Sequence, residues 1–188
     1  PYIAEAFYKA IDAACLFGTN SPFAKNIFGV ASTGGRVIAE ETNPKLDLDI
    51  SDVMALVENE GHDVNGFVAG YDLKNNLRKL RDANGNQLFV TGVDSSTLYS
   101  QPIEFARNGA WDKTKARAIA GDWKYSIIGI RDQIQYETLK EATLQSVQMG
   151  DGKPLSLAEN DMVAIKATMR LGFLPVKESA FAALKPKA

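Results

Sequence analysis

An alternating stretch at residues 163–171 limits the fold of this chain more than any other feature of its sequence. Val163, Ile165, Ala167 and their successors at every second position are apolar, and the residues between them are polar or small. This period of two is the signature of a strand with one buried face and one solvated face. Residues 125–130 form an apolar run, and residues 133–138 alternate again. The sequence from residue 121 to 184 therefore predicts neighbouring strands of one long sheet and a short apolar tail.

Helical patterns precede these strands. Apolar residues recur every three or four positions over residues 3–15, and Gly18 is a good terminator for that helix. Ser51 is predicted to cap a second helix that ends at Gly61. A third helix, for which Asp72 is the predicted cap, has an apolar stripe formed by Leu73, Leu77 and Leu80.

Short strands and turns lie between and after these helices. Residues 65–71 and 87–90 are strand candidates, and the Asn84-Gly85 dipeptide between them predicts a tight turn. Pro102 restricts residues 98–105 to an edge strand or an interrupted one, and residues 115–120 return to a strand-like pattern. The order of strand, helix and strand predicts the α+β class, with a mixed α/β sheet and helices packed on it.

No residues in the sequence form a recognisable catalytic or ligand-binding group. Cys15 falls on the apolar stripe of the first helix, where a buried thiol is inert. His62, the only histidine, has no histidine partner for a metal site, and we expect it to be exposed in a loop. The run from Thr33 to Arg36 lies in a predicted loop at residues 20–35 and lacks the spacing of a phosphate-binding loop. We therefore predict no catalytic, cofactor-binding or metal-binding residues, and no cofactor.

Composition narrows the class of protein further. A chain of 188 residues with 45% hydrophobic content suits one globular unit, or two small units packed together. The formal charge of −2 gives no general attraction to nucleic acid. A single cysteine fits a reducing compartment. There is no apolar run long enough to span a membrane and no secretion signal, so the sequence predicts a soluble protein made in the cytoplasm.

Several segments resemble one protein family, in the same order along the chain. GDWKYSIIGIRDQIQYE and DMVAIKATMRLGFLPVKESAFAAL are similar to the closing region of tailed-phage and prophage major capsid proteins of the Hong Kong 97 type. NGFVAGYDLKNNLRKLRDANGNQLF resembles that family's strand, helix and Asn-Gly turn, and FYKAIDAACLFG resembles the end of its spine helix. The resemblance implies the Hong Kong 97-type fold. It also implies a structural, non-enzymatic head protein that assembles into pentamers and hexamers of an icosahedral shell.

The resemblance also implies a division into two intertwined domains. Residues 1–21 and 123–171 would form part of the elongated P-domain, with the spine-helix tail and the long strands. Residues 22–122 and 172–188 would form the A-domain, against which the apolar end packs. Because the chain starts with Pro1 inside a helical pattern, we expect a fragment without the family's N-terminal arm and E-loop. Such a fragment would be a monomer or a weak small oligomer.

Contacts between copies are the function that the resemblance implies. Other copies of the chain are the expected partners in the virion, with scaffolding, protease and portal proteins as further candidates, and assembly would take place in the host cytoplasm. No membrane and no specific nucleic acid is expected as a partner. Asp161 stands where some relatives carry a crosslinking asparagine, although Asn160 is adjacent, so we predict no isopeptide crosslink. The candidate contact residues between subunits are Arg78, Lys79, Arg81, Asp82, Lys166 and Arg170.

Other functions remain open on the sequence alone. An encapsulin-like nanocompartment shell would use the same fold. A hydrolase could be built around His62 with Cys15 or a serine, and its thiol or histidine would then be essential to turnover. A monomeric α/β binding module is the remaining alternative, and it would bind its partner tightly without assembling.

Overall fold

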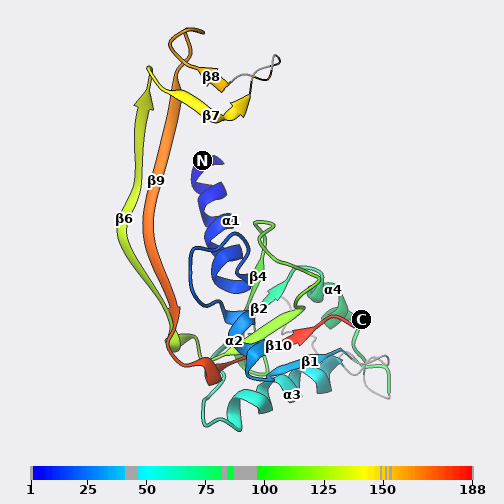
Figure 1. Ribbon diagram of the computed structural model, residues 1–188. Coiled ribbons are helices and arrows are strands. Elements are labelled where there is room, and N and C mark those ends of the chain that lie inside the picture. The colour runs from blue at the N-terminus through cyan, green and yellow to red at the C-terminus, as the bar shows by residue number, and fades with distance from the viewer. Residues whose placement is uncertain are drawn as a thin grey trace. The chain divides into compact units, whose positions relative to one another are not determined.

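The computed structural model describes residues 2–40, 46–81, 84–86, 97–148, 150, 152 and 154–187. They form two compact units, which are treated separately below. Unit 1 comprises Pro1–Ile128 and Phe173–Ala188, and unit 2 comprises Gly129–Gly172. Figure 1 labels their helices and strands.

A mixed sheet forms the centre of unit 1 (Figure 1). Its strands lie in the order β1-β10-β5-β2-β4-β3. β1 runs parallel to β10 and β2 runs parallel to β4, whereas the other neighbours are antiparallel. The predicted α+β class with a mixed sheet is therefore confirmed. The strands are β1 (Val37–Ala39), β2 (Gly66–Gly70), β3 (Thr97–Leu98), β4 (Gln101–Ala106), β5 (Ala118–Gly121) and β10 (Phe181–Lys185).

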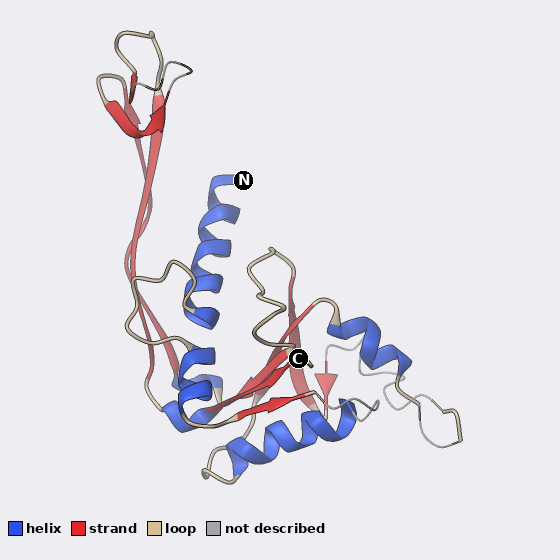
Figure 2. Cartoon of the chain, turned by 45° about the vertical axis from the view of Figure 1, so that its right-hand side comes forward, coloured by secondary structure: helices blue, strands red, loops and turns tan. Residues whose placement is uncertain are grey.

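Helices cover both faces of this sheet, as the helices and strands of unit 1 in Figure 2 illustrate. The alternation of side chains along each strand divides the core: Phe67 and Ala69 of β2 pack with α3 (Leu46–Glu58) and α4 (Leu73–Lys79). Val68, on the opposite face, packs with the buried ends of α1 (Tyr2–Phe17) and α2 (Ile27–Thr33). The central strands need residues that fit between two helical layers, and β2, β5 and β10 are accordingly rich in alanine and glycine.

The first helix ends as predicted, but the predicted loop after it contains a second helix. α1 stops at Phe17, and Gly18 takes a positive φ of 68° while its amide donates to the carbonyl of Ala14. α2 begins because the side chain of Asn26 accepts a hydrogen bond of 2.7 Å from the amide of Gly29. Its apolar residues Ile27, Val30 and Ala31 are buried. The prediction of a loop throughout residues 20–35 is therefore wrong.

Of the two predicted helix caps, Ser51 is wrong and Asp72 is right in position but makes no capping bond. α3 already begins at Leu46, so Ser51 lies inside the helix rather than at its start. The end of this helix is close to the prediction, since it stops at Glu58 and Gly61 follows with a φ of 79°. Asp72 is the N-cap residue of α4, but its backbone is helical and its side chain makes no capping hydrogen bond; Oδ2 pairs with Arg117 instead.

The remaining predictions for unit 1 concern its strands. The strand predicted at residues 65–71 is β2, and the one predicted at 115–120 is the shorter β5. β4 carries Pro102 and lies next to β3, the last strand of the described sheet. The interruption predicted for residues 98–105 falls at a tight turn, where Tyr99 and Ser100 have φ values of 49° and 64°. Gly85 has the positive φ expected of a turn, whereas residues 87–90 lie outside the described residues.

The apolar tail forms a strand inside the sheet of unit 1. The short 3₁₀ helix η2 (Glu178–Ala180) leads into β10, which lies between β1 and β5 in the sheet. Residues 181–184 have no exposed surface. Gly121 of β5 must be small here, because a Cβ at that position would lie 2.6 Å from the carbonyl oxygen of Ala180.

Unit 2 is built from paired strands. The 3₁₀ helix η1 (Trp123–Tyr125) precedes β6 (Ser126–Leu139), which pairs with β9 (Ala164–Pro175) in a two-stranded sheet. β7 (Thr143–Gln148) and β8 (Pro154–Ser156) form an antiparallel hairpin. Residues 157–161 form a turn closed by a hydrogen bond of 2.9 Å from the amide of Met162 to the carbonyl of Leu157.

The strand predicted at residues 163–171 is confirmed, but its predicted burial is wrong. No helix and no third strand covers β6 or β9 within the described part of unit 2. Ile165 is 65% exposed and Val163 is 59% exposed. The alternation therefore marks a strand whose apolar face has no core beneath it within its own unit.

Candidate interaction surface

A hydrolase would depend on His62, whose ring contacts the side chains of Ser179 and Tyr125. Its Nε2 atom lies 2.9 Å from Oγ of Ser179, and its ring meets Tyr125 edge to face at 5.3 Å. His62 is half-buried because its loop packs against η2, so the prediction of an exposed histidine is wrong. Among the residues that the structure describes, no hydrogen bond joins the ring to an orienting carboxylate. A serine and a histidine are present, but the third member of a triad is not.

Cys15 is buried, as predicted, and poorly suited to nucleophilic chemistry. Burial, together with the charge of Asp12, raises the pKa of its thiol to about 11. The residue lines a mainly apolar pocket of about 330 Å³ between α1 and the sheet, and His62 is not part of that pocket. A thiol in this state is almost entirely protonated at neutral pH, so it is a weak nucleophile.

The glycine-containing run before β1 forms a plain turn, as predicted, and Arg36 holds it in place. The buried guanidinium donates from Nε to the carbonyl of Phe181 at 3.1 Å and from Nη2 to the carbonyl of Val30 at 3.3 Å. Nη2 also donates to the carbonyl of Glu178 at 2.5 Å. These contacts join α2, η2 and β10, and they direct the cation inward rather than toward a phosphate.

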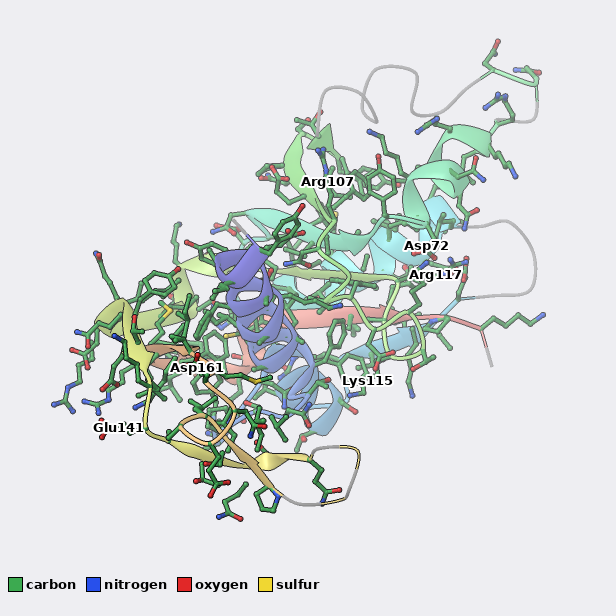
Figure 3. All side chains as sticks on the ribbon, turned by 90° about the horizontal axis from the view of Figure 1, so that it is seen from above. Asp72, Arg107, Lys115, Arg117, Glu141 and Asp161 are labelled. Carbon is green, nitrogen blue, oxygen red and sulfur yellow. The ribbon has the colours of Figure 1, made fainter. Side chains whose placement is uncertain are left out.

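Arg117 forms a second charged cluster that the sequence analysis missed. Its Nε donates to Glu40 at 3.0 Å, and its Nη1 is paired with Asp72; Figure 3 shows Asp72 and Arg117 together. Burial alone would lower the pKa of Arg117, but the hydrogen bonds and charges of both carboxylates outweigh it and raise that pKa. The three residues lie far apart in the sequence, and no local motif links them.

Three of the candidate contact residues lie at the end of α4. Arg78, Lys79 and Arg81 are exposed. Nη1 of Arg81 donates to the carbonyls of Arg78 and Leu80 at 2.7 and 3.0 Å, so part of its bonding capacity serves the end of the helix. Asp82 lies outside the described residues.

The other two candidates lie on β9, and both have partners on β6. Nζ of Lys166 lies 3.3 Å from Glu137, and Nη1 of Arg170 lies 3.4 Å from Asp132. Both pairs are largely solvent-exposed, so each contributes little to stability. The structure therefore brings Lys166 and Arg170 into cross-strand pairs rather than leaving them unpaired.

Large exposed apolar side chains are the more distinctive feature of unit 2. We call this group the β6–β9 strip. Sequence periodicity identified the strand but assigned its apolar side chains to a core, because alternation cannot say what covers a face. The strip comprises Ile130, Tyr136, Met162, Val163 and Ile165, which are 48% to 65% exposed.

The described residues contain no group of three or more histidine, cysteine, aspartate or glutamate side chains that could hold a metal ion. Of the helices described, none combines the length and the apolar content needed to cross a bilayer.

Comparison with known proteins identifies the family. The model of the phage capsid family matches residues 2–185. The chain belongs to the phage capsid family. It is 32% identical over 187 residues to the major capsid protein of Staphylococcus phage 80alpha, a match that covers 99% of this chain and 56% of that protein. The chain thus spans little more than half the length of this curated relative.

Solved structures of phage proteins share the fold. A structure from Microbacterium phage Oxtober96 is 29% identical, with a TM-score of 0.85, and the match covers 100% of this chain and 64% of that one. One from Mycobacterium phage Adephagia is 26% identical, with a TM-score of 0.79, and the match covers 98% and 62%. The Hong Kong 97-type fold implied by the sequence resemblance is confirmed, and the family is one of structural capsid proteins.

Proposed function

We propose that this chain is the shell-forming part of a phage or prophage major capsid protein, which assembles with copies of itself into pentamers and hexamers of an icosahedral head. Membership of the phage capsid family supports this function. The β6–β9 strip is the structural observation that supports this function. A two-stranded sheet with large exposed apolar side chains is poorly stabilised on its own. A monomeric binding module would have no need of such a surface.

The energetic argument favours association through the strip. Covering a fully exposed isoleucine or valine side chain stabilises a protein by about 1.5–3 kcal/mol. The side chains of the strip are about half exposed, so each would contribute about 1 kcal/mol when a neighbour covers it. Several such contributions, repeated around a ring of subunits, are enough to hold a shell of many modest interfaces.

The domain boundaries, contact residues and partners that we assign follow from the same family resemblance. Residues 1–21 and 123–171 would belong to the P-domain, and residues 22–122 and 172–188 to the A-domain. Lys166 and Arg170, on β9, Arg78 and Lys79, on α4, and Arg81, two residues after it, are the polar residues we assign to subunit contacts. The protein would act in the virion after assembly in the host cytoplasm, with scaffolding, protease and portal proteins as further partners. We assign it no enzymatic activity and no isopeptide crosslink at Asp161.

Electron microscopy of the protein at its natural full length tests the proposal. We expect closed shells from the wild type and loss of shells from Ile165→Asp, which places a charge in the strip without removing a buried group. Thr19→Asp, at an exposed loop position in unit 1, is the matched control and should assemble. A wild-type protein that stays monomeric with its neighbouring gene products present would count against a shell function.

A further inference from the structure

The two ends of strand β2 lie beside loops of opposite charge. Glu58, the last residue of α3, is exposed, as are Glu60 and Asp63 in the loop that follows, and residues 58–63 include no basic residue apart from His62. Residues 107–117, between β4 and β5, hold four basic residues. Lys115 pairs with Asp112 and Arg117 pairs with Glu40 and Asp72, so Arg107 and Lys113 supply the charge of this loop that has no ion partner in the described structure. Within the described chain, neither those three acids nor Arg107 and Lys113 of the basic loop form an ion pair with another residue. We call the two segments the acidic loop (residues 58–63) and the basic loop (residues 107–117).

The topology of the sheet places these loops at opposite ends of unit 1. The acidic loop precedes the first residue of β2, whereas the basic loop follows the last residue of β4. β2 and β4 are parallel, so their ends correspond. Figure 1 shows the loop after α3 and the loop after β4 on opposite sides of the sheet.

The basic loop lines a pocket that could receive a side chain. Tyr71, Trp111, Arg107 and Lys113 are among the residues around this space of about 360 Å³. Tyr71 is 53% exposed and packs edge to face on Phe105, over which Nζ of Lys74 lies at 5.7 Å. The pocket therefore combines aromatic walls with positive charge, a setting that suits a carboxylate on an aliphatic stem.

Both loops are held in place before any partner arrives. In the basic loop, Trp111 donates to the carbonyl of Ala116 at 2.7 Å, and the side chain of Asp112 accepts from the amide of Thr114 at 3.0 Å. In the acidic loop, the amide of Gly61 donates to the carbonyl of Glu58 at 2.9 Å, and His62 contacts Ser179. Because the backbone is already ordered, little conformational entropy is lost on contact.

We propose that the acidic loop of one copy docks against the basic loop of the next copy, head to tail. This inference rests on the proposed shell function and identifies one of its contacts. Two different surfaces on opposite ends of the same unit give a heterologous interface, which closes into a ring when the rotation between copies allows it. The charges select that orientation, since contact between two acidic or two basic loops is repulsive.

A charge exchange tests the pairing. Arg107→Glu and Glu60→Arg are made separately and together in the protein at its natural full length. Sedimentation velocity measures ring-sized oligomers, and electron microscopy measures shells. Both positions are exposed and have no ion partner in the described structure, so the melting temperature should not change. Asp52→Lys reverses an exposed acid on α3, outside both loops, and serves as the control.

Each single variant should raise the concentration needed for half-maximal oligomer formation by about tenfold or more, and high salt should reduce this difference. The double variant should return to within about threefold of the wild type, because the charges are exchanged rather than lost. Single variants that form oligomers normally, or a double variant no better than the singles, would overturn the pairing. Loss of oligonucleotide binding in Arg107→Glu, with normal oligomers, would assign the basic loop to nucleic acid and also overturn it.

The two readouts separate this inference from the proposed function. Wild-type shells together with insensitive single variants would leave the shell function standing and remove only the loop pairing. Oligomers that respond to the charge exchange but never form shells would support the pairing and count against the shell function. A wild type that forms neither would overturn both.

Discussion

Arg36 offers the sharpest test of how unit 1 is held together. Its buried guanidinium donates to the carbonyl of Val30 in α2 and to the carbonyls of Glu178 in η2 and Phe181 in β10, which follow about 150 positions later. Replacing it by methionine keeps much of the apolar stem but removes every donor. The carbonyls of Val30 and Phe181 then stay buried without their charged partner.

The expected loss follows from these contacts. A hydrogen bond to a charged group contributes about 1.5–3 kcal/mol, and such contributions from one side chain do not add fully. Gly34, beside the guanidinium, is exposed, so water can reach part of the vacated space. We therefore expect Arg36→Met to lower the free energy of unfolding by about 3–5 kcal/mol, and the melting temperature by about 10 °C.

Urea denaturation followed by circular dichroism measures this loss, and calorimetry gives the melting temperature. Arg107→Met, at an exposed position with no ion partner in the described structure, is the matched control and should change stability by less than about 0.5 kcal/mol. Arg36→Lys, which keeps the charge but not the forked geometry, should fall between the two. An Arg36→Met protein within about 1 kcal/mol of the wild type would refute this account of the contact.

Two further predictions concern ionisable groups. With a pKa of about 11, about one Cys15 thiol in a thousand is ionised at pH 8. Ellman's reagent should therefore react at least about 100-fold more slowly with the native protein than with the protein unfolded in urea. Comparable rates would contradict the burial of Cys15 and restore the cysteine hydrolase as a candidate function. The hydrogen bond from Thr114 is the largest cause of a lowered pKa at Asp112, below its ordinary value of 3.8. Since the folded form binds its proton less readily, Asp112 should stabilise the protein above pH 3.8 and lose this effect as the pH falls through its lowered pKa. An NMR titration should place the pKa of Asp112 below 3.8, and Asp112→Asn should reduce the acid sensitivity of unfolding.

The sequence predicted those parts of the fold that depend on neighbours along the chain. The end of α1 at Gly18 and the long strand β9 both follow from local periodicity and backbone preference. α2 was missed because it has only seven residues, and its stability comes from Asn26 and from burial against β10. The start of α3 was misplaced because a serine that could act as a cap also fits inside a helix.

The charged clusters and the environment of His62 depend on contacts between residues far apart in the sequence, and no local motif predicts such contacts. Arg36 reaches Phe181, and Arg117 reaches Glu40, across long separations in the chain. His62 was expected to be exposed because its partner Ser179 follows it by 117 positions. The period of two in β9 could not distinguish a core from an interface, since both bury one face of a strand. The family resemblance implied contacts between subunits, which periodicity alone does not indicate.

The position of β10 has a consequence for how the protein is made. Residues 181–185 form the strand between β1 and β5, so β1 has no partner in the described sheet until they are in place. During synthesis, the helices and the β2–β4 pair can form early, but the sheet is complete only after residue 185 has left the ribosome. A nascent chain therefore cannot present the finished sheet of unit 1 before β10 has been translated. If the proposed shell function holds, this order would keep a copy from joining its neighbours before its own fold is finished.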